Sequence, residues 1–232
     1  MDLLLLSSSK AGDTGYLETG REAIYAHLSG CQNVVFAPFA GVSISYDDYT
    51  QKVQDALPAL SIKGLHEWDN PKDGVEQADA ILVGGGNTFH LLHCFYTFGL
   101  VDAIREKVSK GTKYVGWSAG SNVAGNSIRT TNDMPIIEPK SFDALQLVPF
   151  QINPHFTNYQ PPGHNGETRA ERLGEFMVIN PDMPILAIPE GVGLKVSENR
   201  FSLVGEGESF VFQGGKQQPI TDEQALALLL KR

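Results

Sequence analysis

A strand, a sharp turn and the start of a helix are encoded in succession by Lys113-Tyr114-Val115-Gly116-Trp117-Ser118-Ala119-Gly120-Ser121-Asn122-Val123-Ala124. The central five residues fit the pattern G-x-S-x-G, in which a strand-to-helix turn exposes the serine hydroxyl. Backbone N–H groups at such a turn point toward one place, as a developing oxyanion requires. The glycines permit the turn because side chains there would clash. A glycine-rich loop that merely contains a serine is the plainer alternative.

Short apolar runs alternate with helical patterns through the first half of the chain. We expect strands at 2–7, 33–37, 61–66, 79–83 and 112–116, and helices near 16–29, 46–57 and 88–110, the last broken at Gly99. This alternation indicates βαβ units. We therefore predict an α/β fold, with a mostly parallel twisted sheet and helices on both of its faces.

The second half of the chain is less regular. We expect strands near 150–153 and 184–188, a helix at about 167–178, and a β-meander over 192–213. Thr221-Asp222-Glu223-Gln224 fits a capping box, and the apolar run Ala225–Leu230 behind it predicts a C-terminal helix. Since the sequence shows no repeat or linker, we expect residues 1–232 to form one domain.

The composition argues against several classes of partner. The formal net charge of −9 disfavours binding to nucleic acid or to an anionic membrane. The two cysteines, Cys31 and Cys94, are too few for a disulfide framework and favour a reducing compartment. The apolar start, Met1–Leu6, is too short for a signal peptide, and no apolar run has the length of a membrane span. We therefore expect a cytoplasmic protein.

A run of three glycines, Gly84–Gly86, follows the expected strand 79–83. Its uncovered N–H groups suit an anion, but the phosphate-loop and dinucleotide patterns are absent. An oxyanion donor at Gly86 is therefore favoured over a nucleotide cradle. A metal site is not expected, because His90 and His93 lack an evident third ligand.

Histidine and carboxylate residues follow the later strands. His155 ends an apolar strand and follows a proline, which makes it a candidate general base. Glu190, behind Ile188-Pro189, can orient and stabilise the imidazole, and Asp133 in a polar loop competes for that role. Ligands of open α/β sheets bind outside the carboxyl ends of strands, so we expect these groups along one edge.

Longer motifs carry a family resemblance. They are Phe39-Ala40-Gly41-Val42, Val83–Phe89, Gly116–Gly120, Ile128–Pro135, Gln151–Asn158 and Gly166–Arg169. With these motifs the chain resembles the peptidase E family of α-aspartyl dipeptidases, serine peptidase family S51, which is related to class I glutamine amidotransferases. The likeness weakens after about residue 191, and Ser121 stands where the family is expected to have alanine.

The resemblance implies a class I glutamine amidotransferase-like fold and hydrolysis of dipeptides with N-terminal aspartate (Asp-X), with no cofactor. It implies Ser118 as nucleophile, His155 as base and Glu190 as the third member of the triad. The N–H groups of Gly86 and Ala119 would form the oxyanion hole. This order of serine, histidine and acid differs from that of α/β-hydrolases, so the turn does not indicate an esterase.

An N-terminal aspartate requires a cation for its β-carboxylate. Arg169 and Arg172 are spaced i, i+3 at the start of the helix expected at 167–178, and an arginine fork matches a carboxylate. The alternative is a solvated face paired with neighbouring glutamates. The resemblance favours Arg169 over Arg172. Asp133 is a candidate acceptor for the substrate amine, and Asn87 is a further substrate-binding candidate.

Other functions remain open at this stage. A hydrolase of aspartyl-arginine polymer, like cyanophycinase, would share the serine turn, and a non-catalytic binding protein could use the same scaffold. A glutamine amidotransferase is disfavoured because residue 118 is serine and not cysteine. The segment 157–166 is either a mobile lid or an ordinary surface loop. We expect a monomer or a homodimer that binds a small peptide.

Overall fold

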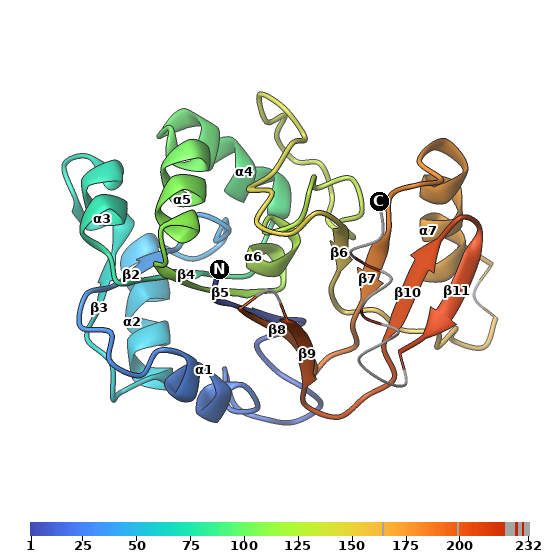
Figure 1. Cartoon of the computed structure of the whole chain (residues 1–232), viewed down its shortest axis with the longest axis horizontal. Helices are drawn as coiled ribbons and strands as arrows, with labels where there is room; N and C mark the ends of the chain where they lie inside the picture. The colour runs from blue at the N-terminus through green and yellow to red at the C-terminus, as the bar shows by residue number, and fades with distance from the viewer. Residues whose placement is uncertain (164, 199, 221–225, 227–228, 230–232) are drawn as a thin grey trace.

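Two β-sheets lie side by side in the computed structural model, which describes residues 1–220 except 164 and 199, together with residues 226 and 229 (Figure 1). The larger sheet has the strand order β3-β2-β4-β5-β1-β8-β9, and the smaller has the order β11-β10-β7-β6. The predicted fold class, a mostly parallel α/β architecture with C-terminal strands, is confirmed. The later strands, however, form a sheet of their own.

Five parallel strands make up most of the larger sheet. They are β1 (Leu3–Leu6), β2 (Val34–Ala37), β3 (Ile62–Gly64), β4 (Ala80–Val83) and β5 (Lys113–Trp117). The hairpin of β8 (Gly193–Ser197) and β9 (Arg200–Val204) extends the sheet beside β1 in antiparallel pairing. The carboxyl ends of β1, β4 and β5 therefore meet at one edge.

Helices cover both faces of this sheet (Figure 1). One face carries α1 (Arg21–His27) and α2 (Tyr46–Ala56); the other carries the 3-10 turn η1 (Leu65–Glu67), α3 (Pro71–Gln77), α4 (Thr88–Thr97) and α5 (Leu100–Ser109). Alternate residues of β4 pack into the two cores, since Ile81 joins the α3–α5 side and Leu82 the α1–α2 side. This division explains the continuous apolar runs of the sequence.

The helix boundaries differ in detail from the expectation. The break at Gly99 between α4 and α5 is confirmed, and the glycine has a φ of +63°. The first helix is shorter than the expected 16–29, because residues 17–20 form turns and Leu17 has a φ of +57°. None of the described helices is both long and apolar enough to cross a membrane.

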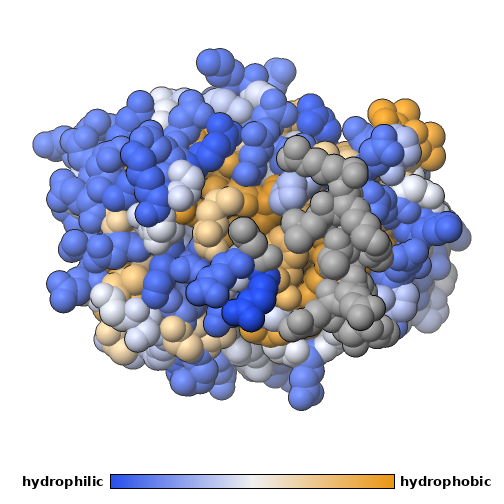
Figure 2. Space-filling model, viewed as in Figure 1, coloured by the Kyte–Doolittle hydropathy of each residue, from blue (hydrophilic) through white to orange (hydrophobic). Residues whose placement is uncertain are grey.

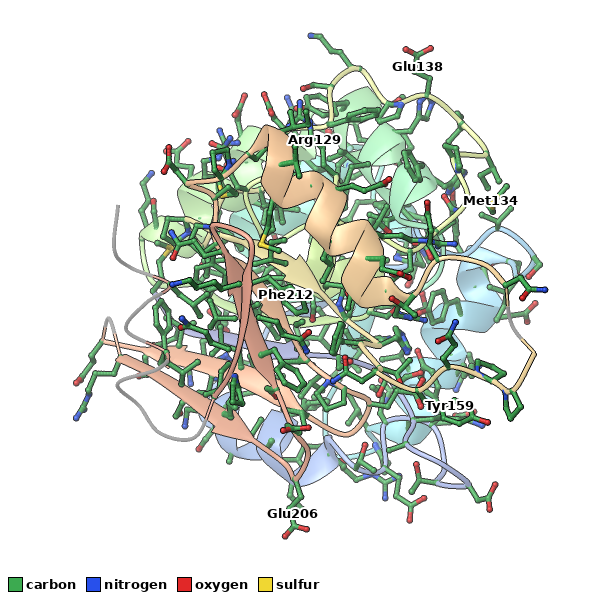
Figure 3. All side chains as sticks on the ribbon, turned by 90° about the vertical axis from the view of Figure 1, so that its right-hand side faces the viewer. Arg129, Met134, Glu138, Tyr159, Glu206 and Phe212 are labelled. Atoms are coloured by element: carbon green, nitrogen blue, oxygen red, sulfur yellow. The ribbon has the colours of Figure 1, made fainter. Side chains whose placement is uncertain are left out.

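The smaller sheet contains β6 (Gln151–Asn153), β7 (Ile185–Ala187), β10 (Phe210–Gln213) and β11 (Lys216–Pro219). Strands β6 and β7 are parallel neighbours. Helix α7 (Arg169–Ile179) packs on this sheet through a core that includes Phe156, Leu173 and Phe212 (Figure 3). At its C-terminal end α7 exposes the apolar side chains of Val178 and Ile179 on an otherwise largely hydrophilic region (Figure 2).

The segment expected as one meander over 192–213 forms strands of two hairpins in different sheets. Glycines with positive φ at 205 and 207 lie between the hairpins and permit the change of direction. Alternate residues of β10 explain why this strand belongs to the smaller sheet, because Phe210 and Phe212 pack in the core between that sheet and α7. The helix expected at 225–230 and its capping box at 221–224 lie largely outside the described residues.

Candidate active site

Ser118 lies in a strained turn between β5 and the short helix α6 (Ala119–Asn122). Its φ of +54° and ψ of −114° fall outside the regions that a serine ordinarily adopts. Both flanking glycines are sterically required. A Cβ at Gly116 would lie 2.4 Å from the Gly120 oxygen, and one at Gly120 would lie 2.1 Å from the Val83 oxygen. The glycines of G-x-S-x-G thus let β5, the turn and β4 approach closely.

His155 follows β6 and also has a positive φ, of +54°. Its backbone N–H donates to Ser7 Oγ at 2.7 Å, and the Ser7 hydroxyl donates to the Ile188 carbonyl at 2.9 Å. Ser7 follows β1 of the larger sheet, whereas the other two residues belong to the region of the smaller sheet. This buried serine therefore holds the strained histidine against the sheet that carries Ser118. Sequence reasoning missed it, although Ser7-Ser8-Ser9 directly follows a strand.

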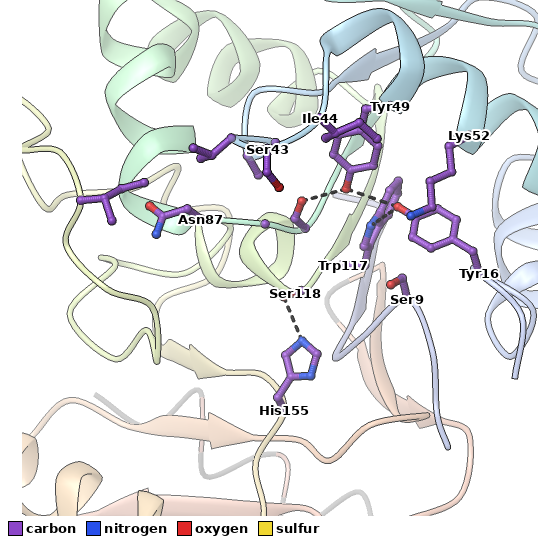
Figure 4. Close-up of a pocket in the computed structure, with 16 residues that line it drawn as sticks. Ser9, Tyr16, Ser43, Ile44, Tyr49, Lys52, Asn87, Trp117, Ser118 and His155 are labelled. Carbon is purple, nitrogen blue, oxygen red and sulfur yellow. Dashed lines mark hydrogen bonds between the residues drawn. The ribbon is translucent and has the colours of Figure 1, made fainter. Parts of the chain in front are cut away.

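The side chains of Ser118, His155 and Glu190 form a continuous hydrogen-bonded series. His155 Nε2 lies 2.9 Å from Ser118 Oγ (Figure 4). On the other side of the ring, His155 Nδ1 lies 2.8 Å from Glu190 Oε1. A carboxylate only accepts hydrogen bonds, so in the neutral imidazole Nδ1–H donates to Glu190 and Nε2 accepts from the serine hydroxyl. Glu190 follows β7, and the parallel pairing of β6 with β7 brings it beside His155. The arrangement can withdraw a proton from Ser118.

Asp133, the competing orienter of His155, points elsewhere. Its Oδ2 accepts hydrogen bonds from the Thr88 N–H at 2.8 Å and the Thr88 hydroxyl at 2.6 Å. These donors lie at the N-terminus of α4, where a carboxylate is favoured. Of the two carboxylates that the sequence left open, the one in contact with His155 is therefore that of Glu190.

Two backbone N–H groups near Ser118 are available to an oxyanion. Gly86 has a φ of +139°, and a Cβ there would lie 2.2 Å from the Ala40 oxygen. The glycine run passes close to the serine, because a Cβ at Gly85 would lie 2.9 Å from Ser118 Cβ. Ala119 is the first residue of α6. Within the described part of the chain, neither the Gly86 nor the Ala119 N–H donates a hydrogen bond.

A cavity of about 530 Å³ opens beside Ser118 and His155 (Figure 4). Asn87 lines it, but this side chain also accepts from the His90 N–H and donates to the Met134 carbonyl. Other parts of the wall, which sequence reasoning did not single out, are Ser9, Tyr16, Tyr49, Lys52 and Trp117. The described residues contain no group of three or more histidine, cysteine or acidic residues that could hold a metal ion.

Arg169 and Arg172 have different surroundings on α7. Arg169 is half-buried and donates to the Pro154 carbonyl at 3.4 Å, directly before His155. Burial lowers the pKa of its guanidinium, and the Arg172 charge lowers it further, while the carboxylates of Glu190 and Asp133 oppose this shift. Arg172 is exposed and lies 3.7 Å from Glu167. The solvated-face alternative therefore describes Arg172, whereas Arg169 lies near the carboxylates of Glu190 and Asp133 but is not among the residues that line the cavity.

A cation at the position of Arg169 is unfavourable without an anion. It is the first residue of α7, where the helix dipole disfavours positive charge. Half-burial adds a desolvation cost. A half-buried guanidinium held under these conditions close to the backbone that carries His155 is typical of a functional site.

Comparisons with known proteins identify the family of this chain. The sequence model of peptidase family S51 matches residues 3–204. A peptidase E from Shewanella putrefaciens (strain CN-32) is 53% identical over 220 residues, covering 94% of this chain and 93% of the relative. A peptidase E from Shewanella sp. (strain ANA-3) is 51% identical over 234 aligned positions, covering 100% of this chain and 99% of the relative.

A solved structure shares the fold. It is a peptidase from an acI-B1 Actinobacterium, with a TM-score of 0.67 at 19% identity, covering 95% of this chain and 93% of that one. At this identity the likeness concerns the fold alone. The family match and the Shewanella relatives extend over most of the chain. The chain therefore belongs to peptidase family S51, and as a member of that family it is a serine dipeptidase.

Proposed function

We propose that this dipeptidase hydrolyses dipeptides with N-terminal aspartate, with Ser118 as nucleophile, His155 as general base and Glu190 as the group that orients the imidazole. The observation that carries the proposal is the position of His155, with Nε2 at 2.9 Å from Ser118 Oγ and Nδ1 at 2.8 Å from Glu190 Oε1. These are the distances at which a base and its orienting group work.

The reaction proceeds by acyl transfer. His155 takes the proton of the Ser118 hydroxyl as Oγ attacks the scissile carbonyl, and it then gives that proton to the leaving amine. The peptide bond breaks, and an aspartyl ester of Ser118 remains. His155 then deprotonates a water molecule, which attacks the ester. The ester bond breaks, aspartate is released, and His155 returns the proton to Ser118 Oγ. Glu190 stabilises the imidazolium present in both steps.

The N–H groups of Gly86 and Ala119 stabilise the tetrahedral oxyanion. Neither N–H group donates a hydrogen bond within the described part of the chain. Ala119 directly follows Ser118, and Gly86 belongs to the glycine run beside it. One such donor contributes about 3 kcal/mol to the transition state.

Substrate recognition rests on charge. The Arg169 guanidinium binds the β-carboxylate of the N-terminal aspartate, with Arg172 contributing less because it is exposed. Asp133 Oδ1, which accepts no hydrogen bond from a described residue, receives the substrate ammonium. Asn87 lines the cavity and contacts the peptide there.

The test is a panel of Asp-Leu, Asn-Leu, Glu-Leu and aspartyl-arginine polymer, with the rate of product release measured for each. We expect Asp-Leu to be preferred over Asn-Leu by about 100-fold or more, because the half-buried guanidinium of Arg169 is left without a carboxylate partner when Asn-Leu binds. Equal rates for the three dipeptides would contradict recognition by Arg169. Turnover of the polymer alone would indicate the cyanophycinase-like alternative. Membership of a peptidase family already favours an enzyme over a binding protein.

We further propose a cytoplasmic, single-domain enzyme that is a monomer or a homodimer. Both cysteines are free, as a reducing compartment favours. The largest core cluster contains residues of both sheets, such as Leu3 and Leu186, which supports one folding unit. Light scattering after size-exclusion chromatography, together with a single cooperative unfolding transition, tests the assembly and domain proposals.

A further inference from the structure

A buried tyrosine in the wall of the cavity beside Ser118 also contacts the glycine run. Tyr49 belongs to α2, is 6% exposed, and donates its hydroxyl proton to the Gly85 carbonyl at 2.8 Å. A Cβ at Gly84 would lie 2.5 Å from the same hydroxyl, so glycine is required for this contact. None of the steps above uses Tyr49, although it reaches the backbone next to Gly86.

The hydroxyl of Tyr49 is the last member of a chain of hydrogen bonds (Figure 4). The Trp117 indole Nε1–H donates to the Tyr16 hydroxyl at 3.1 Å, and Tyr16 donates to the Tyr49 hydroxyl at 3.3 Å. An indole N–H can only donate and a carbonyl can only accept. The two phenols between them therefore have one arrangement that satisfies every member, with all donors directed from Trp117 toward Gly85. Burial raises the pKa of both phenols, so they keep their protons.

The receiving carbonyl belongs to the peptide group whose other end is the Gly86 N–H. A peptide group is planar and trans, so its C=O and N–H point in opposite directions. Fixing the Gly85 oxygen on Tyr49 therefore aims the Gly86 N–H away from α2. Glycine on both sides of this peptide offers little resistance to its rotation. A hydrogen bond to the carbonyl also polarises the N–H, as in other hydrogen-bonded chains.

We propose that Tyr49 is a positioning residue of the oxyanion hole, which acts through the Gly85–Gly86 peptide, and that Tyr16 and Trp117 fix the direction of its hydroxyl. This inference rests on the proposed function. Tyr49 touches no reacting atom, but it determines where one oxyanion donor points. Trp117, at the first variable position of G-x-S-x-G, thereby links the turn that carries Ser118 to the Gly86 side of the oxyanion hole.

The test is Tyr49→Phe, which removes the hydroxyl and keeps the ring. We expect kcat for Asp-Leu to fall about 10-fold, which is less than the roughly 10²–10³-fold that loss of a whole oxyanion donor costs, while KM changes less than about twofold. Affinity for a boronic-acid analogue of aspartate, which forms a tetrahedral adduct with Ser118, should fall by a similar factor. Affinity for Asp-Leu, measured calorimetrically in Ser118→Ala with and without Tyr49→Phe, should not change.

The matched control is Tyr46→Phe. Tyr46 lies on the same helix, but its hydroxyl contacts the Cys94 sulfur at 3.9 Å and not the glycine run. We expect its kcat to stay within about twofold of the wild type. Tyr16→Phe, which keeps Tyr49 in place, should lower kcat by a smaller factor and serves if Tyr49→Phe fails to fold.

Three results would overturn the inference. They are an unchanged kcat in Tyr49→Phe, a loss of dipeptide affinity equal to the loss of kcat, and an equal loss in Tyr46→Phe. A wild type that fails to hydrolyse Asp-Leu would contradict the proposed function instead. In that event the boronic acid still measures whether Tyr49 stabilises a tetrahedral adduct.

Discussion

The centre around Ser118 and the recognition region around Arg169 differ in how firmly the protein holds them. His155 is fixed by three hydrogen bonds of 2.7–2.9 Å, to Ser7, Ser118 and Glu190. Arg169 has one hydrogen bond to a described residue, at 3.4 Å. In the proposed mechanism, the three side chains of the reaction centre are therefore in place before substrate binds, whereas the guanidinium gains a strong hydrogen-bond partner from the substrate carboxylate. From this difference we expect changes in the first region to affect the rate of chemistry, and changes in the second to affect discrimination between substrates.

The largest effect should come from the reaction centre. We expect Ser118→Ala to lower kcat for Asp-Leu by about 10⁴- to 10⁶-fold, because the members of such a triad act as a unit. The mutant should still bind Asp-Leu with nearly wild-type affinity. Steady-state kinetics and calorimetry measure the two quantities, and residual activity within 10-fold of the wild type would contradict the account.

The next effect tests the orienting carboxylate. Glu190→Gln keeps the shape of the side chain but allows it to donate to His155 Nδ1 and so favours the wrong tautomer. The corresponding change in a serine protease lowers kcat about 10⁴-fold, and we expect about 10²- to 10³-fold here because Glu190 is 53% exposed. Asp133→Asn serves as the comparison and should act mainly on KM. A larger loss of kcat in Asp133→Asn would reverse the assignment.

Arg169→Met should affect discrimination more than chemistry. We expect kcat/KM for Asp-Leu to fall about 100-fold, as loss of a charge-assisted fork to a carboxylate implies, while the low rate for Asn-Leu changes little. The ratio of the two specificity constants is the measurement. A ratio that stays at its wild-type value would show that another cation binds the aspartate side chain.

A residue remote from both regions, His27, should contribute to the pH dependence of stability. Burial, assisted by Lys113 and Lys195 and opposed by Asp2, lowers the pKa of His27 from its ordinary 6.5 to about 4. The unfolded chain thus binds a proton between pH 6.5 and 4 that the folded protein does not. The free energy of unfolding should decrease by about 3 kcal/mol across this window as the pH falls.

His27→Leu should remove most of that pH dependence. Urea denaturation at several pH values measures it, and the comparison uses slopes with pH and not absolute stabilities. The same experiment defines the pH range in which a loss of activity is not caused by unfolding. An identical slope in both proteins would show that other groups control acid stability.

The smallest effect is expected at Arg172. The Arg172 side chain is exposed, and its ion pair with Glu167, at 3.7 Å, is weak. We therefore expect Arg172→Met to change kcat/KM for Asp-Leu by less than about threefold. It is the matched control for Arg169→Met, on the same helix and with the same change in charge. Equal losses in the two variants would place the discrimination in the general charge of α7.

Local pattern was enough to predict the parts that depend on neighbours in sequence. The strand–turn–helix at Ser118, the glycine run at Gly86 and the break at Gly99 follow from backbone requirements within a few residues. Parallel-strand logic also predicted that His155 and Glu190 follow strand ends. It could not choose between Glu190 and Asp133, because that depends on the pairing of β6 with β7.

Long-range contacts explain what was missed. Ser7 meets His155 across 148 residues, and Tyr49 meets Gly85 across 36. Neither side chain belongs to a periodic pattern, so nothing local distinguishes it from other serines and tyrosines. The sequence did not predict the second sheet for a similar reason, since strands of three or four residues carry little information about which strands they pair with.

The most direct test of the account is to trap the covalent intermediate. An activated aspartyl ester, mixed with the wild type and quenched in acid, should leave an aspartyl group on the peptide that contains Ser118, as read by mass spectrometry. Ser118→Ala should show no such group, and His155→Ala should acquire it far more slowly. An adduct on another residue, or hydrolysis without any adduct at Ser118, would contradict the proposed nucleophile.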